Sequence, residues 1–224
     1  EMCIRDRTYT EPTIFFEYSY DIARLAREAG IASVYVTNGY MTSEMLELFQ
    51  GLDGGHGPWL DAANVDLKAF CDETYKKVCA ARLQPVLDSL VRMKELGVWV
   101  EVTTLVVPDL NDSEDELGEI ARFIASELGV EVPWHVSRFH PDYKMHDRGP
   151  TPASTLRRAY DLGREAGLKY VYVGNMPGAR LEDTYCSNCG QTVLERWGFQ
   201  IGRRNLRDGK CGNCATLVDG VGMS

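Results

Sequence analysis

Hydrophobic and polar positions follow two periods in the middle of the chain. Short runs rich in β-branched residues predict strands at 32–37, 63–67, 98–107, 134–139 and 169–173. Between them, apolar residues at helical spacing predict helices at 20–29, 43–49, 85–96, 114–128 and 155–166. Glycine follows four of these helices at or near the end, at positions 30, 97, 129 and 167. This alternation predicts an α/β fold with a parallel sheet, either doubly wound or rolled into a barrel.

The alternation changes near the C-terminus. Met176-Pro177-Gly178 interrupts the pattern, and paired cysteines, glycines and short strand-like runs follow. We therefore expect a boundary within 175–183, with a domain over 8–183 and a separate module over 184–224. No GxGxxG or GxxxxGK[S/T] sequence occurs in the chain, so a nucleotide-binding doubly wound fold has no support from its usual phosphate loops.

Four of the seven cysteines form two CxxC pairs, separated by 21 residues: Cys186, Cys189, Cys211 and Cys214. Each pair can present two thiolates to one ion from a tight turn, and two pairs complete a tetrahedral shell of sulfur. Zn²⁺ is the metal typical of such closed, structural sites. A rubredoxin-like iron and a pair of redox disulfides remain alternatives. We expect a zinc-ribbon-like module that needs its metal to fold.

The net charge of −9 argues against a general nucleic-acid binder. The charge is uneven, since residues 186–224 carry +2 and the rest of the chain −11. Arg203, Arg204 and Arg207 fit either an acidic partner or, more simply, a solvated hairpin. No apolar run approaches the ~18 residues of a membrane span, so we expect no membrane contact. Cysteines arranged for metal binding fit a reducing compartment, and we expect the cytoplasm.

Polar residues follow the ends of several predicted strands, where active sites of parallel β/α folds lie. They suit a zwitterionic small molecule with hydroxyl groups. Each also has a simpler interpretation: Asn38 as a turn former, Asp66 and Lys68 as an ion pair on one side of a strand, His140 as a loop histidine, and Glu11 as a helix-entry residue before Pro12. The informative feature is that all of them are expected on one rim, formed by the carboxyl ends of the strands. Its members are Thr10, Glu11, Asn38, Asp66, Lys68 and His140.

Several of these segments resemble a known family. Thr10-Glu11-Pro12 resembles the Gly-Gly-Glu-Pro motif of radical S-adenosylmethionine enzymes. Thr37-Asn38-Gly39 and Asp66-Leu67-Lys68 resemble strand ends of the pyruvate formate-lyase activating enzyme group, as does Val106-Val107-Pro108. From residue 8 onward the chain is similar to the radical enzyme of the AmmeMemoRadiSam system, notably at 134–145 (WHVSRFHPDYKM) and 170–175 (YVYVGN).

The resemblance implies a partial (β/α)6 TIM-like barrel that binds a [4Fe–4S] cluster and S-adenosylmethionine. An electron from the cluster, supplied by a donor partner, would cleave this cofactor to methionine and a 5′-deoxyadenosyl radical that abstracts hydrogen from a substrate. Carried over by motif, Thr10 and Glu11 would hold the methionine amino group. Asn38, Asp66 and Lys68 would contact the ribose or the carboxylate, and His140 would lie near the adenine. The motifs do not specify the substrate; a protein, as for an activase, is one option.

The family's cluster-binding CxxxCxxC is the main departure. It does not occur in this sequence, and Cys71 and Cys79 fit one helical segment better than a cluster site. Residues 1–7 (EMCIRDR) resemble the translation of a sequencing-library adapter, although a native polar strand is the alternative. We therefore expect an N-terminally truncated barrel that lacks its first strand and its cluster loop, and a chain that is inactive although its parent is an enzyme.

Two other classes of function stay open at this point. One is a non-catalytic β/α and zinc-ribbon module that binds RNA or a protein partner. The acidic charge of the chain makes this the weaker hypothesis. The other is a metal-free hydrolase or isomerase that uses Asp66, Lys68 and His140. Activity without iron and in air would distinguish the latter from a radical enzyme.

Overall fold

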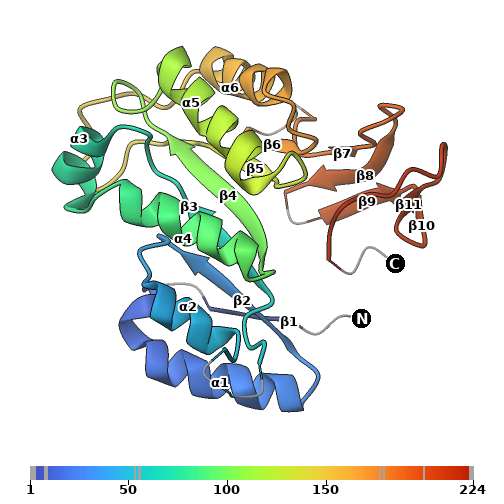
Figure 1. Ribbon diagram of the computed structural model, residues 1–224. Coiled ribbons are helices and arrows are strands. Elements are labelled where there is room, and N and C mark those ends of the chain that lie inside the picture. The colour runs from blue at the N-terminus through green and yellow to red at the C-terminus, as the bar shows by residue number, and fades with distance from the viewer. Residues whose placement is uncertain are drawn as a thin grey trace. The chain divides into compact units, whose positions relative to one another are not determined.

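The computed structural model of the chain describes residues 4–7, 10–52, 54, 57–176, 178, 180–198 and 200–221 (Figure 1). The chain divides into two compact units, Glu1–Thr103 and Thr104–Ser224, which are described separately below. The strand order is β1-β2-β3-β4-β5-β6, and β4 (Trp99–Val106) contributes its first residues to one unit and its last to the other.

The first unit is a parallel sheet with helical crossovers. Its other strands are β1 (Ile4–Arg7), β2 (Ala32–Thr37) and β3 (Ala62–Asp66), and each pairs in parallel with the next. Its helical segments are η1 (Pro12–Phe15), α1 (Phe16–Glu28), α2 (Ser43–Phe49), α3 (Asp72–Thr74), the π-helical η2 (Tyr75–Cys79) and α4 (Gln84–Glu95). Helix α1 packs on β2, and α2 packs on α4.

Aromatic side chains hold this layer together. Phe49 from α2 meets Phe16 and Tyr35 edge to face, with ring centroids 5.1 Å apart in both pairs. Phe49 and Tyr35 are fully buried, and the Tyr35 hydroxyl is hydrogen-bonded to Ser19 of α1. Such contacts add about 0.5–1.5 kcal/mol per pair beyond the burial of their area. They fix α1 and α2 on the sheet that carries the strand ends described below.

The second unit repeats the alternation. It contains β5 (Trp134–Arg138) and β6 (Val171–Gly174), which pair in parallel, together with α5 (Glu114–Phe123), the π-helical η3 (Ile124–Leu128) and α6 (Ala153–Glu165). Helices α5 and α6 lie side by side, and α6 packs on both strands (Figure 1). Gly163 allows this approach, because a Cβ there would lie 2.7 Å from Val171 and 3.1 Å from the Trp134 ring.

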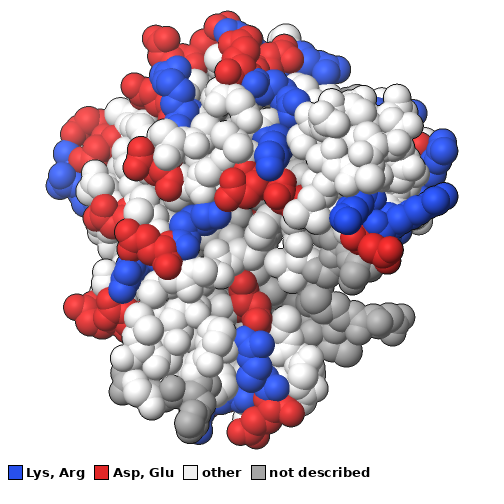
Figure 2. All heavy atoms as spheres, turned by 45° about the vertical axis from the view of Figure 1, so that its right-hand side comes forward, with Lys and Arg blue, Asp and Glu red and all other residues white. Residues whose placement is uncertain are grey.

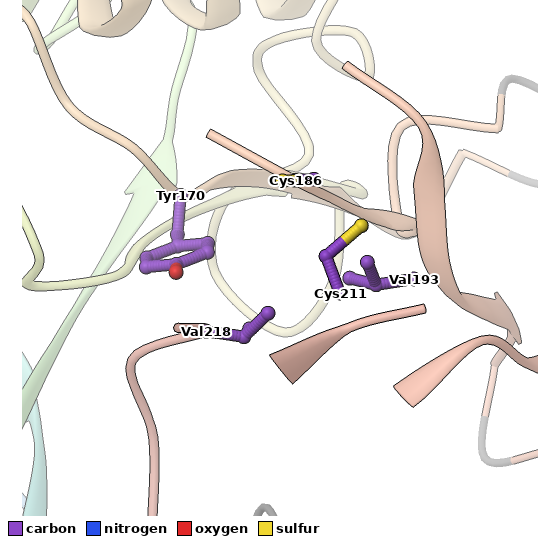
Figure 3. Packing of buried hydrophobic residues seen from close by; sticks show 5 residues of the cluster. All are labelled: Tyr170, Cys186, Val193, Cys211 and Val218. Carbon is purple, nitrogen blue, oxygen red and sulfur yellow. The ribbon is translucent and has the colours of Figure 1, made fainter. Parts of the chain in front are cut away.

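The C-terminal ribbon belongs to the second unit. It consists of an antiparallel sheet, β7 (Thr184–Tyr185), β8 (Thr192–Trp197) and β9 (Gln200–Arg204), and a small hairpin, β10 (Leu206–Arg207) and β11 (Lys210–Cys211). Its buried core includes Tyr170, which precedes β6 (Figure 3). The members of this cluster are Tyr170, Cys186, Val193, Cys211 and Val218. The two units therefore divide within β4, whereas the sequence indicated a boundary near 175–183; the bounds 8–183 and 184–224 stay a prediction.

Most element types agree with the sequence prediction. The hydroxyl of Ser113 accepts a hydrogen bond from Glu116 N and caps α5, and Gly30, Gly97 and Gly167 have φ of 70°, 80° and 95°. The polar segment Ile4–Arg7 pairs with β2 as the outermost strand of a six-stranded sheet, and the expectation that the barrel lacks its first strand stays a prediction. Pairing needs only backbone groups, so a polar segment can supply it. The origin of residues 1–7 stays a prediction, and residues 1–3 lie outside the described part.

Among the described residues, no helix combines the length and the apolar character that crossing a membrane requires.

Candidate cofactor site and candidate metal centre

Glu11 organises the strand ends of the first unit. Its Oε1 accepts hydrogen bonds from Thr37 Oγ1 at 2.5 Å, Thr13 Oγ1 at 3.0 Å and Thr13 N at 3.3 Å. Its Oε2 accepts from Asn38 N at 2.7 Å and from Asn38 Nδ2 at 2.6 Å. Glu11 thus caps the 3₁₀ turn that Pro12 begins, as the helix-entry interpretation predicted, and also holds the turn after β2.

These contacts also set the charge state of Glu11. Partial burial opposes ionisation, but the hydrogen bonds from Thr37, Asn38 and Thr13 together outweigh it and lower the pKa of the carboxyl below its usual value. Five donors occupy a group with about four lone-pair sites. A ligand ammonium that contacts Glu11 must therefore replace one of these donors, and exposed Asn38 is the one best placed to leave.

Asp66 and Lys68 lie at the end of β3 and form an ion pair, with Nζ 2.7 Å from Oδ2. Their side chains are 36% and 39% exposed, so both are partly open to solvent. The hydroxyl of Tyr75 accepts a hydrogen bond from Lys68 N at 3.0 Å, and burial raises the pKa of Tyr75 to about 12. Tyr75, which the sequence did not single out, therefore stays protonated and fixes the backbone that carries Lys68.

The remaining predicted residues are less constrained. Thr10 is exposed and has a φ of 62°, a left-handed conformation that turns the chain into η1. His140 is exposed and belongs to the second unit. The cofactor roles predicted for Thr10 and His140, and for the other rim residues, stay predictions.

Two polar residues near the rim of the second unit have structural roles. Asn111 is buried; its Oδ1 accepts from Val107 N at 2.7 Å, and its Nδ2 donates to Leu105 O at 2.9 Å. Thr151 is also buried, and its Oγ1 accepts from Phe139 N and donates to Val106 O. Thr151 thereby fastens the loop after β5 to the end of β4. No local pattern in the sequence indicates this link, because it joins residues far apart in the chain.

The four ribbon cysteines converge as their spacing predicted. Their Sγ atoms all lie within 4.8 Å of one another, with Cys186 and Cys214 at 3.5 Å and Cys189 and Cys211 at 3.7 Å. A tetrahedral ion with bonds of about 2.3 Å to sulfur needs edges of about 3.8 Å. The site fits one ion. A [4Fe–4S] cluster interposes its irons between the thiolates and spreads them further apart, so the site is too compact for it.

The environments of these thiols differ. Burial raises the pKa of Cys186 to about 11, whereas hydrogen bonding with Thr216 lowers the pKa of Cys214 to about 6. A bound metal ion would add its own charge and favour the thiolate form of all four cysteines. Cys71 is exposed and Cys79 half-buried, at either end of the α3–η2 segment, in agreement with the prediction that they belong to one helical segment.

A model of the family described as the Radical SAM superfamily matches residues 8–124, which is more than half of the chain. The chain belongs to the radical SAM superfamily. The matched segment contains the Glu11 network and the Asp66–Lys68 pair. The Thr10-Glu11-Pro12 resemblance to this family is therefore supported by a match over the whole first unit beyond residue 7.

Two curated relatives of this radical SAM chain are similar in sequence. An uncharacterized protein of Methanocaldococcus jannaschii is 47% identical over 214 residues, which cover 95% of this chain and 61% of that protein. The pyruvate formate-lyase-activating enzyme of Clostridium pasteurianum is 26% identical over 141 residues, which cover 58% of this chain and 56% of that protein. The chain thus spans about three fifths of the length of these relatives.

The fold also matches solved structures. A domain of the pyruvate-formate lyase-activating enzyme from Bacteroides vulgatus superposes with a TM-score of 0.64 at 16% identity, over 76% of this chain and 98% of that domain. At this identity the match establishes the fold alone. It agrees with a parallel α/β sheet of the partial TIM-like barrel type.

Proposed function

We propose that the strand ends of the first unit bind S-adenosylmethionine, in an enzyme that cleaves this cofactor reductively to start hydrogen abstraction. The observation that carries the proposal is the Glu11 network, which links the ends of two neighbouring strands at the Thr10-Glu11-Pro12 motif. The ionised Glu11, the amide of Asn38 and the Asp66–Lys68 pair offer partners for an ammonium, hydroxyls and a carboxylate.

Each residue has a distinct part in the proposal. The methionine ammonium replaces Asn38 Nδ2 on Glu11, next to Thr10, and the released Asn38 amide turns to a ribose hydroxyl. Lys68 receives the methionine carboxylate, and Asp66 keeps the Lys68 ammonium oriented or accepts a ribose hydroxyl. Thr37 and Thr13 remain on Glu11 and keep it ionised. The assignment of His140 to the adenine rests on the family resemblance alone.

The cluster would be bound by a CxxxCxxC segment, which this sequence does not contain, in a longer protein truncated here at its N-terminus. When bound, a [4Fe–4S] cluster supplies the electron that splits the sulfonium, and an electron donor must reduce it. The ribbon does not fit this task, because its four thiols suit a single ion. We place the enzyme in the cytoplasm as part of the proposal. Without the cluster-binding segment, this chain alone would be inactive.

We further propose that the ribbon holds a structural Zn²⁺. Four thiols without an open position match closed zinc sites. The ligands Cys186 and Cys211 lie in the same buried cluster as Tyr170, so the metal would stabilise the packing around the start of β6 (Figure 3). Iron in the same shell is the alternative, and metal analysis distinguishes the two.

The AmmeMemoRadiSam assignment and an activase-like role complete the proposal. The segments 134–145 and 170–175 support the former, and the similarity to the C. pasteurianum activating enzyme supports the latter. The alternative of an RNA-binding module has no better support: on the face shown in Figure 2, acidic and basic side chains are interspersed rather than gathered into a basic surface.

Equilibrium binding of S-adenosylmethionine to this chain tests the proposal without the cluster. Calorimetry should detect binding that Lys68→Ala weakens about tenfold, the effect of one charge-assisted hydrogen bond. Lys76→Ala is the matched control, since Lys76 also pairs with carboxylates but on α3 and η2. Equal affinity of the chain and both variants, or no binding at all, would contradict the proposal.

A further inference from the structure

A pocket of about 260 Å³ lies between the segment that follows β6 and the β8–β9 hairpin of the ribbon. Its lining includes Met176, Arg180, Glu195, Trp197 and Ile201. Strand β6 ends at Gly174, so the pocket begins two residues beyond its carboxyl end. Barrels of the β/α type place their active sites on this side of the sheet. The position favours a role in substrate binding.

The wall of the pocket exposes large apolar side chains. Trp197 is 75% exposed and Ile201 65% exposed, and both line the pocket. They belong to neighbouring pairs of the β8–β9 ladder, Trp197 with Gln200 and Ile201 with Arg196, so they lie on opposite faces of the hairpin. Apolar surface of this kind, framed by charged residues, marks interaction sites.

The charged groups around the pocket already have polar or aromatic partners. The Arg180 guanidinium lies 3.1 Å from Asp183 and 3.3 Å from Glu195, and Glu182 accepts a hydrogen bond from Gly198 N. Arg196 donates to Thr184 Oγ1 and lies over the Tyr172 ring. Three carboxylates at this wall disfavour a phosphate or an RNA backbone. The pocket therefore suits an uncharged, apolar group.

Strand β9 offers a second feature beside the pocket. It is the outer strand of the sheet β7-β8-β9 (Figure 1). All five of its residues are exposed. An exposed outer strand can accept an additional strand through its backbone groups. Arg203 and Arg204 lie on β9, and exposed Arg207 follows on β10. A segment laid along β9 would pass Arg203 and Arg204.

We propose that the β8–β9 hairpin binds an extended acidic segment of a polypeptide substrate, with one large apolar side chain of that segment in the pocket. At about 260 Å³ the pocket is large enough for one large side chain and lies just below the usual size of small-molecule sites, about 300–1,000 Å³. The backbone of the segment adds to β9, and its carboxylates face the arginines. The inference deepens the proposed function by naming a substrate class. It rests on that function, because only a radical enzyme with its active site at the strand ends would bring its substrate to the end of β6.

Fluorescence anisotropy of labelled synthetic peptides tests this inference on the full chain. The probe is a peptide of alternating Val and Glu with a central Leu. Two comparison peptides carry Lys in place of Glu, or Gly in place of Leu. We expect saturable binding of the probe and at least tenfold weaker binding of both comparison peptides. Equal binding of all three, no binding of the probe, or tighter binding of an oligouridylate RNA would overturn the inference.

Variants locate the binding on the hairpin. Ile201→Glu and Arg203→Glu should each weaken binding of the probe peptide about tenfold. Arg203→Glu should also strengthen binding of the Lys peptide. Leu217→Ala is the matched control, since Leu217 is 62% exposed in the same ribbon but does not line the pocket. If Leu217→Ala weakens binding as much as Ile201→Glu, the site is not the hairpin.

The result of the peptide-binding experiment can be separated from the result for S-adenosylmethionine binding. Loss of peptide binding in a chain that binds S-adenosylmethionine refutes the peptide site alone. Peptide binding in a chain that does not bind S-adenosylmethionine leaves the docking site standing and refutes the proposed function.

Discussion

Glu11 binds both the backbone N–H and the side-chain amide of Asn38, at 2.7 and 2.6 Å, on one carboxylate oxygen. This pair joins the N-cap of η1 to the turn that follows β2. It makes Glu11 both an anchor for the strand ends and the proposed partner of the methionine ammonium. The two roles have different experimental signatures.

Glu11→Gln should reduce both stability and affinity for S-adenosylmethionine. An amide has one acceptor oxygen and brings an NH₂ group against the Asn38 donors, so we expect a loss of about 2–3 kcal/mol in the free energy of unfolding. Urea denaturation and calorimetry measure the two effects. Thr13→Ala removes one donor to Glu11 and should affect stability more than binding. Unchanged unfolding of Glu11→Gln would contradict the network.

The stability of the chain should depend on pH through Glu11. Its folded pKa lies below the unfolded value of about 4.3, so the carboxylate stabilises the fold above pH 4.3. That contribution is lost as pH falls through the folded pKa. The difference in urea midpoint between the chain and Glu11→Gln should therefore be largest near neutral pH and shrink below about pH 4. A difference that stays constant across this range would argue against an ionised Glu11.

Lys68 should matter for ligand binding and little for folding. Its pair with Asp66 is more than a third exposed, and such pairs contribute about 0–1 kcal/mol. Lys68→Ala should therefore leave the urea midpoint nearly unchanged. A large loss of stability in Lys68→Ala would instead favour the simple ion-pair interpretation.

Removal of metal should unfold the ribbon and loosen its core. Cys211 is buried and belongs to the ribbon core, so Cys211→Ser or chelation should lower the thermal midpoint and expose this core to hydrogen exchange. Mass spectrometry of the native chain should find one zinc per chain, and none in Cys211→Ser. Cys71→Ser, at an exposed cysteine outside the ribbon, is the control and should retain the metal.

Tyr170 should couple the ribbon to the start of β6. Its hydroxyl donates to Asp219 Oδ2 at 3.1 Å and accepts from Asp219 N at 3.0 Å. Tyr170→Phe leaves both groups without this partner, so we expect a cost of about 1–3 kcal/mol in the free energy of unfolding. Asp219→Asn should cost less in the Tyr170→Phe background than in the native chain, which a double-mutant cycle measures. Additive costs would show that the contact carries no coupling.

The sequence predicted what depends on local patterns. Helix α2 was predicted with its observed bounds, because Thr42 caps it and its apolar face is regular. Helix α1 begins at Phe16, earlier than the predicted residue 20, because aromatic packing against Phe49 extends it. The CxxC spacing also sufficed to place four thiols together.

Contacts between distant segments could not be predicted. Nothing near Glu11 indicates that Thr37 and Asn38, more than 20 residues away, will bind it. The role of Tyr75 depends on the π-helical turn after α3, which has no periodic signal. Tyr170 likewise resembles an ordinary strand residue until the ribbon packs on it. In each case tertiary geometry, rather than local pattern, gives the residue its function.

The most direct test of the central claim is product analysis in a protein that joins a CxxxCxxC segment to this chain. After anaerobic reconstitution with iron and sulfide and reduction with dithionite, S-adenosylmethionine should give 5′-deoxyadenosine and methionine in equal amounts. Replacing the three motif cysteines by alanine should abolish both products. Intact S-adenosylmethionine in the presence of a reduced cluster would contradict the assignment of this chain to a radical enzyme.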